Sequence, residues 1–144
     1  MKVGIIGLGR MGEGMARRML KTGIEVHGYR NNYKKAEEQF EKGYISGCAT
    51  SIQYLVDEIH RNKTTGVTPG VFMMVVPAET VEDTIDELLQ YCVEGDIIID
   101  HGNSNFKDSR RRAERLAKWG IAYIDCGTSA VSYTHLTLPT RLLV

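Results

Sequence analysis

The feature that most constrains this chain is a glycine-rich turn near its start, placed between a short apolar run and a helical pattern. Residues 2–6 (Lys-Val-Gly-Ile-Ile) predict a buried strand, and Gly7-Leu8-Gly9-Arg10-Met11-Gly12 follows directly. A helix is then predicted as far as about residue 22, with a glycine just beyond it as a stop signal. This strand, turn and helix form the sequence context in which a Gly-x-Gly-x-x-Gly run binds a dinucleotide.

Each glycine of the turn has a separate physical task in such a site. Gly7 permits the tight bend, Gly9 lets the backbone approach a pyrophosphate, and Gly12 lets the helix pack closely on the strand. The helix N-terminus presents backbone amides and a partial positive charge to the phosphates. The alternative interpretation is a glycine-rich turn that holds no ligand.

Strand and helix patterns alternate along the rest of the chain. Strands are predicted at residues 25–29, 71–76, 96–99 and 121–125, and helices at residues 34–42, 51–60, 80–91 and 107–118. Residues 61–70 are rich in polar and turn-forming residues and predict a loop within the same domain. Strands separated by helices imply right-handed crossovers, so we predict an α/β fold of the Rossmann-like, doubly wound class with a mainly parallel sheet.

Methionines recur within two of these predicted elements. Met11, Met15 and Met19 lie four residues apart on the first predicted helix, and Met73 and Met74 lie in a predicted buried strand. Methionine at such positions usually fills a hydrophobic core, so we predict core packing for all five.

Composition excludes several classes of function. The chain has 144 residues, enough for one domain, and a formal net charge of zero. No basic stripe with interleaved aromatic residues is present, so we predict no nucleic-acid partner. The run Arg110-Arg111-Arg112 lies on a predicted helix close to Glu114, which favours a solvated helix face.

Membrane and metal roles are also not predicted. No segment reaches the roughly 20 apolar residues of a membrane span, and Met1-Lys2 leads directly into a strand, without the apolar stretch of a secretory leader. We therefore expect no membrane partner and a cytoplasmic location. Cys48, Cys92 and Cys126 are widely spaced, which argues against a disulfide framework and against a zinc site.

A second polar loop follows the strand predicted at residues 96–99. It reads Asp100-His101-Gly102-Asn103-Ser104-Asn105-Phe106-Lys107-Asp108-Ser109 and leads into a helix. The carboxyl ends of parallel strands meet at the ligand crevice, so this loop is a candidate edge of an active site. Asp100 is expected to accept backbone amides of its own turn. For His101, a solvent-facing or hydrogen-bonded side chain is the favoured interpretation, with an acid–base role as the alternative.

The end of the second predicted strand bears on the choice of cofactor. It reads Tyr29-Arg30-Asn31-Asn32, with no carboxylate to accept a ribose 2′-hydroxyl and one guanidinium able to pair with a 2′-phosphate. We predict NADP as cofactor, with NAD possible, and a cofactor contact for Arg30, Asn31 and Asn32. The alternative is that Arg30 is an ordinary surface residue.

The last residues break the alternation of strands and helices. Residues 131–140 can be encoded by a DNA sequence that resembles a transposon-end adapter used in DNA sequencing. We predict a folded region at residues 1–130 and a non-native tail at residues 131–144. A genuine short C-terminal strand is the alternative.

Four ordered segments together resemble the coenzyme-binding domain of decarboxylating 6-phosphogluconate dehydrogenases. They are the glycine turn, Val76-Pro77-Ala78, the loop that begins at Asp100, and Asp125-Cys126-Gly127-Thr128-Ser129. The resemblance covers residues 1–129. It implies oxidation of 6-phospho-D-gluconate and loss of carbon dioxide to give ribulose 5-phosphate.

The resemblance also assigns roles to individual residues. Val76, Pro77 and Ala78 would line the path of the cofactor, Asn103 would contact both cofactor and substrate, and Ser129 would contact substrate. In this family the general base and general acid lie in a following helical domain, which also builds the dimer. The resemblance therefore implies no catalytic residue in this chain, a missing C-terminal helical domain, and a full-length homodimer or homotetramer.

Two other functions remain open at this point. One is a stand-alone regulatory module that binds a dinucleotide without chemistry. The other is a fragment of a 3-hydroxyisobutyrate-type dehydrogenase, because that related group shares the first glycine turn.

Overall fold

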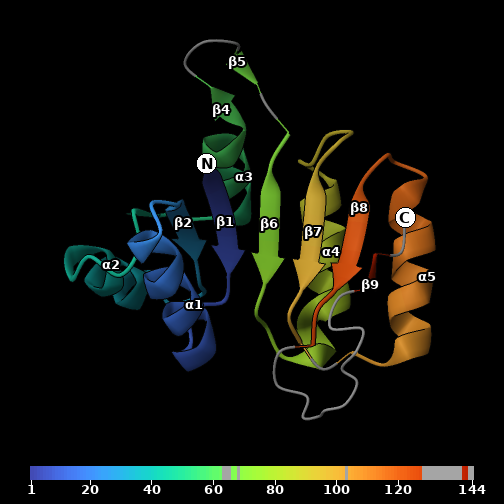
Figure 1. Ribbon diagram of the computed structural model, residues 1–144, viewed down its shortest axis with the longest axis horizontal. Helices are drawn as coiled ribbons and strands as arrows, with labels where there is room; N and C mark the ends of the chain where they lie inside the picture. Colours follow the sequence, from blue (N-terminus) through green and yellow to red (C-terminus); the bar gives the residue numbers. More distant parts are fainter. Residues whose placement is uncertain (63–65, 68, 103, 128–140, 143–144) are drawn as a thin grey trace.

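The computed structural model describes residues 1–62, 66–67, 69–102, 104–127 and 141–142. In this part of the chain seven strands form one sheet in the order β3-β2-β1-β6-β7-β8-β9 (Figure 1). The strands are β1 (Lys2–Ile6), β2 (Glu25–Tyr29), β3 (Gly47–Cys48), β6 (Val71–Met74), β7 (Ile97–Asp100), β8 (Ala122–Asp125) and β9 (Arg141–Leu142). Pairing is parallel from β3 to β8, and β9 runs antiparallel to β8.

Helices connect the parallel strands. They are α1 (Arg10–Lys21), α2 (Tyr33–Glu41), α3 (Ile52–His60), α4 (Val81–Leu89) and α5 (Phe106–Ala117), with a short 3₁₀ helix η1 (Ala78–Thr80) before α4. The chain builds outward from β1 to β2 and β3, then returns to place β6 on the other side of β1. This reversal at β1 is the switch point of a doubly wound sheet, so the predicted Rossmann-like α/β class is confirmed.

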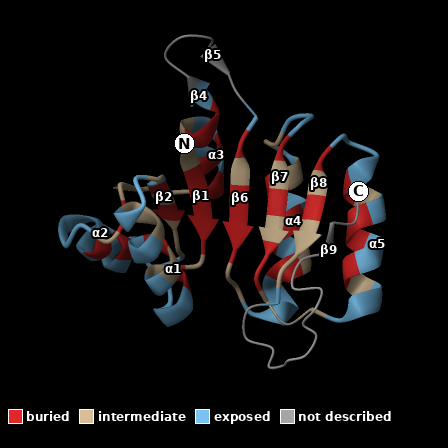
Figure 2. Cartoon of the chain, viewed as in Figure 1, coloured by how far each residue is buried: buried red, intermediate tan, exposed pale blue. Residues whose placement is uncertain are grey.

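Side-chain alternation along the strands divides the core into two clusters. On one face, Phe72, Met74 and Ile98 pack with buried residues of α3, α4 and α5. On the other face, Ile5 and Met73 belong to a cluster that includes residues of α1 and α2. Neighbouring residues of a strand therefore go to opposite faces, and the central strands are buried along most of their length (Figure 2).

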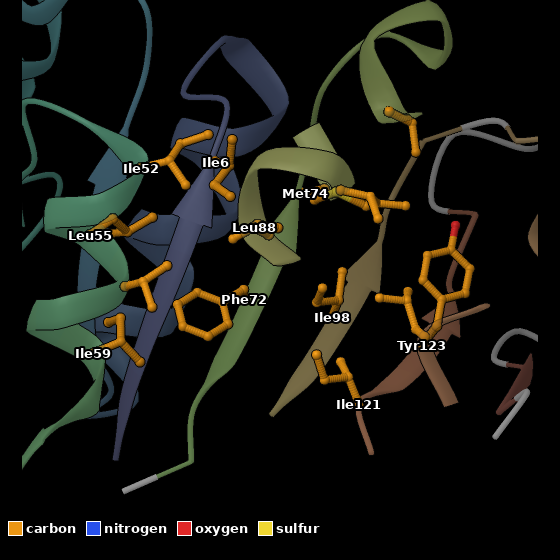
Figure 3. Packing of buried hydrophobic residues seen from close by; sticks show 14 of the residues in the cluster. Ile6, Ile52, Leu55, Ile59, Phe72, Met74, Leu88, Ile98, Ile121 and Tyr123 are labelled. Atoms are coloured by element: carbon orange, nitrogen blue, oxygen red, sulfur yellow. The ribbon is translucent and has the colours of Figure 1, made fainter. Parts of the chain in front are cut away.

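The larger cluster joins helix and sheet directly. Ile52, Leu55 and Ile59 project from α3 toward Phe72 and Ile6 of the sheet (Figure 3). Burying one such side chain contributes about 1.5–3 kcal/mol, so this cluster is a major source of stability for the β1–β6 half of the sheet.

Polar side chains define where several helices begin. The Asn32 side chain accepts the backbone amide of Lys35 at the start of α2, and Ser51 accepts that of Tyr54 at the start of α3. Asn105 caps α5 in the same way. These caps confirm the predicted helices to within one or two residues of their ends.

Short strands account for most differences from the predicted elements. The predicted pattern did not include β3, which has only two residues. It also did not include a small antiparallel hairpin of β4 (Arg61–Asn62) and β5 (Gly66–Val67), which lies within the predicted loop at residues 61–70. Two residues are too few to show the alternation by which a strand is recognised.

The C-terminal segment is described only at Arg141 and Leu142. These two residues form β9 and pair with Asp125 and Ile124 of β8. They therefore extend the sheet by a short strand. The non-native origin of residues 131–144 stays a prediction. The rest of residues 128–144 lies outside the described residues.

One methionine departs from its predicted place. Met73 and Met74 are buried, and Met15 and Met19 pack against the cluster formed with α1. Met11 is 40% exposed at the first turn of α1, so the prediction that it packs in the core is wrong. No helix among the described residues is long and apolar enough to cross a membrane.

Candidate functional site

The carboxyl ends of the parallel strands form a row at one edge of the sheet. Ile6 pairs with both Tyr29 and Met74, and Met74 pairs with Asp100. The segments that follow these strands therefore emerge side by side. The glycine turn, the residues after β2, the Val75–Pro77 segment and the loop after Asp100 all begin at this edge, where doubly wound proteins bind ligands.

Two glycines of the turn are required by the protein itself. Gly7 has a φ of +102°, and a Cβ there would lie 2.1 Å from the carbonyl oxygen of Val75. A Cβ on Gly12 would lie 2.0 Å from the carbonyl oxygen of Gly7. Both positions are too crowded for any side chain, so these glycines allow α1 to start close to β1 and β6.

Gly9 differs from the other two glycines because no protein atom requires it. A Cβ on Gly9 would meet nothing within 4 Å. Gly9 is also the N-cap of α1, with no side-chain capping bond. The first amides of a helix have no acceptor within the helix, and a bare backbone beside them leaves room for an anionic group. This geometry fits the pyrophosphate of a dinucleotide.

A pocket of about 550 Å³ opens beside the turn. Residues from the glycine turn, the end of β2, the Val75–Pro77 segment and α4 line it. They are Ile6, Gly7, Leu8, Gly9, Tyr29, Arg30, Asn31, Asn32, Ile52, Val75, Val76, Pro77, Thr80, Asp83, Thr84 and Glu87. The pocket therefore brings together eight of the predicted cofactor residues, from three segments far apart in the sequence: Gly7, Leu8, Gly9, Arg30, Asn31, Asn32, Val76 and Pro77.

Among the described residues, four that were predicted to bind the cofactor do not line this pocket. Arg10, Met11 and Gly12 belong to the first turn of α1, and Ala78 starts η1. Gly12 acts through packing, as described above. A cofactor role for Arg10, Met11 and Ala78 remains a prediction.

Several lining residues were not predicted from the sequence. Thr80, Asp83, Thr84 and Glu87 come from η1 and α4. The available signal was the polar face of this helix, opposite the buried Val81, Ile85 and Leu88. A polar helix face is usually solvated, so the pattern alone did not indicate a pocket.

The three polar residues after β2 already have partners in the protein. Nη1 of Arg30 donates to the carbonyl oxygen of Leu8 at 2.9 Å, so Arg30 is not an ordinary surface residue. Asn31 accepts a hydrogen bond from the Tyr29 hydroxyl at 3.2 Å, and Asn32 caps α2. Arg30 thus supports the glycine turn as well as lining the pocket.

Asp100 anchors the second loop from inside the protein. Its side chain is fully buried. One carboxylate oxygen accepts the Gly102 amide at 2.9 Å, which confirms the predicted turn. The other accepts the hydroxyls of Ser104 at 2.5 Å and Tyr123 at 2.6 Å. Burial and the hydrogen bond to Asp100 raise the pKa of Tyr123, so this hydroxyl remains a donor.

Arg112 completes this network, contrary to the predicted solvated face. The residue is buried, and its Nε donates to Glu82 of α4 at 2.6 Å while Nη1 donates to Ser104 at 3.0 Å. Nη1 also lies 3.8 Å from the Asp100 carboxylate. The expectation failed because the partner of Arg112 lies thirty residues away in sequence rather than at Glu114.

The Glu82 carboxylate pairs with more than one arginine. Burial alone would raise the pKa of Glu82, but hydrogen bonds from Arg112 and Arg111 outweigh it and lower the pKa. Arg115 also pairs with this carboxylate at 3.5 Å. The charged pairs tie α5 to α4 beneath the second loop.

His101 is buried, not solvent-facing as one favoured interpretation had it. It is 7% exposed, and its backbone amide continues the sheet ladder by donating to Met74 at 2.9 Å. Burial lowers the pKa of His101 despite the opposing effect of Asp100. The imidazole is therefore neutral near pH 7. Asn103 and Ser129, the two predicted substrate contacts, lie outside the described residues.

One cluster of possible metal ligands lies away from this edge. Ligand atoms of Glu25, His27 and Glu58 lie within 4.8 Å of one another. Glu25 already contacts His27 at 2.6 Å, and Lys2 pairs with Glu58 at 3.4 Å. The absence of a metal site remains a prediction.

The fold and the pocket define a dinucleotide-binding domain of the Rossmann class. Within this class, residues 2–134 match the family described as "NAD binding domain of 6-phosphogluconate dehydrogenase", and the chain belongs to that family. A curated relative from Candida albicans, "6-phosphogluconate dehydrogenase, decarboxylating", is 38% identical over 130 residues; the alignment covers 88% of this chain and 24% of the relative.

Curated relatives named as NADP(+)-dependent and as NAD(+)-dependent are both similar to this chain. An NADP(+)-dependent 6-phosphogluconate dehydrogenase from Bacillus subtilis is 35% identical over 131 residues, covering 89% of this chain and 26% of the relative. An NAD(+)-dependent one from Haloferax volcanii is 35% identical over 129 residues, covering 90% and 40%. The chain thus spans between a quarter and two fifths of the length of these relatives.

Solved structures show the same fold. The 6-phosphogluconate dehydrogenase of Plasmodium falciparum matches with a TM-score of 0.72 at 23% identity, covering 86% of this chain and 26% of that one. A 3-hydroxyisobutyrate dehydrogenase from Salmonella typhimurium matches with a TM-score of 0.71 at 21% identity, covering 98% and 46%.

Proposed function

We propose that this chain is the coenzyme-binding portion of a 6-phosphogluconate dehydrogenase that uses NADP. The full-length enzyme would oxidise 6-phospho-D-gluconate and decarboxylate it to ribulose 5-phosphate. The observation that carries the proposal is the pocket beside Gly9, where an open backbone at a helix start meets the guanidinium of Arg30. Family membership supports the same reaction.

Different residues of the pocket would bind different parts of the cofactor. The backbone from Gly7 to Gly12 would hold the pyrophosphate, Arg30 would face a ribose 2′-phosphate, and Val76 and Pro77 would line the path toward the nicotinamide. When bound, the nicotinamide supplies the hydride acceptor of the oxidation. The chain's own contribution is to bind and orient this group.

Substrate contacts are proposed for the loop after β7 and the segment after β8. Asn103 would reach both cofactor and substrate, and Ser129 would reach substrate. The support is positional, since Gly102 and Ser104, on either side of position 103, are both held by Asp100 at the ligand edge. The general acid and base would come from a helical domain outside residues 1–144, as would the contacts of a homodimer or homotetramer.

Two measurements test this proposal. First, the 144-residue chain should bind NADP in a calorimetric titration yet show no turnover of 6-phosphogluconate, because acid–base groups must lie within hydrogen-bond reach of the substrate. Robust turnover by this chain would contradict the assignment of catalysis to another domain. Absence of any dinucleotide binding would contradict the proposal as a whole.

Second, the full-length protein should distinguish the candidate substrates. We expect oxidation of 6-phosphogluconate with release of carbon dioxide, and little oxidation of 3-hydroxyisobutyrate. The structural similarity to a 3-hydroxyisobutyrate dehydrogenase makes that compound the appropriate comparison. Preference for 3-hydroxyisobutyrate would assign the chain to that alternative. Cofactor binding by a full-length protein without either activity would favour a regulatory module.

A further inference from the structure

A buried glutamine joins the glycine turn to the end of β2. Gln39 of α2 is 8% exposed. Its Nε2 donates to the carbonyl oxygen of Leu8 at 2.9 Å and to the carboxylate of Glu13 at 2.8 Å. Its Oε1 accepts from Nη1 of Arg30 at 3.3 Å. One side chain thus contacts the turn, α1 and the proposed cofactor-reading arginine.

We infer that Gln39 is a specificity-determining positioning residue for a dinucleotide that carries a 2′-phosphate. It would act by holding the Arg30 guanidinium against the glycine turn. The inference rests on the proposed function, because it concerns the same pocket. It adds a residue that contacts two lining residues, Leu8 and Arg30, without lining the pocket itself.

The chemistry of its partners permits only one orientation of the Gln39 amide. The Leu8 carbonyl and the Glu13 carboxylate can only accept hydrogen bonds, so both must face the NH₂ group. The Arg30 guanidinium can only donate, so it must face the amide oxygen. In the reversed orientation, the amide oxygen would face two acceptors and the NH₂ group would face a donor. The side chain is therefore locked, which is the condition for positioning another group.

Arg30 is fixed through a single nitrogen. Nη1 donates both to the Leu8 carbonyl at 2.9 Å and to Gln39 at 3.3 Å. Within the described part of the chain, the hydrogen bonds of Arg30 all use Nη1. Because the guanidinium is planar and rigid, fixing one nitrogen also restricts where the other two point. A preorganised fork loses less entropy when it binds a phosphate.

The hydrogen bonds accepted by Leu8 distinguish the effect of Gln39 on Arg30 from its effect on the glycine turn. The Leu8 carbonyl accepts from both Arg30 and Gln39. When the Gln39 amide is removed, Leu8 keeps the bond from Arg30, so the turn stays supported. Arg30, in contrast, loses one of its two acceptors. The loss should therefore fall mainly on recognition of the 2′-phosphate.

The test is a titration of the whole 144-residue chain with NADP, NAD, 2′,5′-ADP and 5′-ADP. The two adenosine compounds separate the 2′-phosphate from the nicotinamide half. Gln39→Met removes the amide while keeping the length of the side chain. Gln53→Met, at an exposed position of α3, is the matched control. Gln39→Asn, which keeps an amide but withdraws it from Arg30, serves if Gln39→Met does not fold.

We expect Gln39→Met to weaken NADP and 2′,5′-ADP by about tenfold, and NAD and 5′-ADP by less than about twofold. In an Arg30→Met background, the same change should weaken NADP and NAD by equal factors, because the Leu8 carbonyl then loses its second donor while no guanidinium remains to be positioned. The control should bind every probe like the wild type.

Four results would overturn the inference. Equal losses for NADP and NAD would mean that Gln39 only supports the glycine turn. If Gln39→Met still lowers the ratio of NADP to NAD affinity in the Arg30→Met background, Gln39 does not act through Arg30. If the wild type prefers NAD, there is no preference for the 2′-phosphate for Gln39 to determine, although the proposed dinucleotide site would remain supported. If the wild type binds none of the four probes, the proposed function fails and this inference fails with it.

Discussion

At the scale of single residues, two glycines of one turn serve different purposes. Gly12 is required by the fold, because a Cβ there would lie 2.0 Å from the Gly7 carbonyl oxygen. Gly9 has open space around it and an extended backbone with a φ of −71° that alanine also adopts. We therefore expect effects on stability and on ligand binding to be separable within these six residues.

This difference gives a paired prediction. Gly12→Ala should destabilise the chain by about 3 kcal/mol, because neither the backbone carbonyl nor α1 can move away without losing packing. Gly9→Ala should change stability by less than about 0.5 kcal/mol but weaken dinucleotide binding by at least about tenfold, since the methyl group would occupy ligand space. Chemical denaturation and calorimetric titration measure the two effects. If Gly9→Ala binds the cofactor normally, the proposed pyrophosphate position is wrong.

Arg30 combines two tasks in one side chain. The sequence predicts that Arg30→Ala weakens NADP roughly 10- to 100-fold while changing NAD little. Its hydrogen bond to the Leu8 carbonyl shows that Arg30 also supports the turn on which both cofactors would depend. The structure thus links the residue proposed to read the 2′-phosphate to the shape of the turn.

We therefore expect Arg30→Ala to weaken both cofactors. NADP should lose roughly 10- to 100-fold, whereas NAD should lose only about two- to fivefold, because Gln39 still donates to Leu8. Arg18→Ala, a change of an exposed arginine of α1 outside the pocket, is the matched control. Parallel titrations of both cofactors measure the ratio. An equal loss for NADP and NAD would show that Arg30 has no role in reading the phosphate.

At the scale of elements, buried charges hold α4, α5 and the end of β7 together. Arg112 of α5 lies between Glu82 of α4 and Asp100 of β7. Removing one partner of such a group leaves a buried charge without compensation, which typically costs 3–5 kcal/mol. The second polar loop is therefore part of the stable framework through Asp100, although its sequence is typical of a surface turn.

Protonation of this network should appear in the acid stability of the protein. The pKa of Glu82 in the folded state lies below its ordinary value of 4.5, so the unfolded chain takes up the proton first as pH falls. Its contribution is complete above about pH 4.5 and is lost as pH falls through the folded pKa. Burial likewise lowers the pKa of His101 below 6.5, which removes stability as pH falls below that value.

Two substitutions should separate these pH windows. Glu82→Gln should flatten the stability profile below about pH 4.5, and His101→Gln should flatten it just below 6.5. Glu87→Gln, on the same helix as Glu82, provides a control for the change of charge. Denaturant unfolding between pH 3 and 8 gives the profiles. An unchanged slope in either window would show that the group does not titrate differently on folding.

At the scale of the whole molecule, the sheet continues past its parallel part. β9 adds only the pairs Leu142 with Ile124 and Arg141 with Asp125. This pairing is only two residues long, and the described members of the two core clusters all precede it. The non-native origin proposed for residues 131–144 is compatible with so short a pairing.

Deletion of residues 131–144 should therefore leave the domain folded. We expect the free energy of unfolding to change by less than about 1 kcal/mol, the range of a peripheral alteration. Thermal and urea denaturation of the shortened and full chains provide the comparison. A loss of several kcal/mol would show that the tail is native structure packed on the core.

Local patterns carried enough information for the arrangement of strands and helices. The apolar runs of β1, β6 and β7 and the spacing of Val81, Ile85 and Leu88 follow from which residues must avoid water. The glycine turn was recognisable because its function depends on backbone conformation close in sequence. Elements of two residues, such as β3, were missed because they have no period.

What only the tertiary structure decided is how residues distant in sequence become partners. Arg112 reads as one of three surface arginines, yet the packing of α4 and α5 on the same core cluster places it against Glu82 and beside Asp100. Gln39 reads as an exposed helix residue, yet the packing of α2 beside the turn buries its amide on Leu8. Hydrophobic periodicity reports only whether a side chain is buried. Which polar groups meet there depends on strand order and helix placement, and these result from the packing of the whole chain.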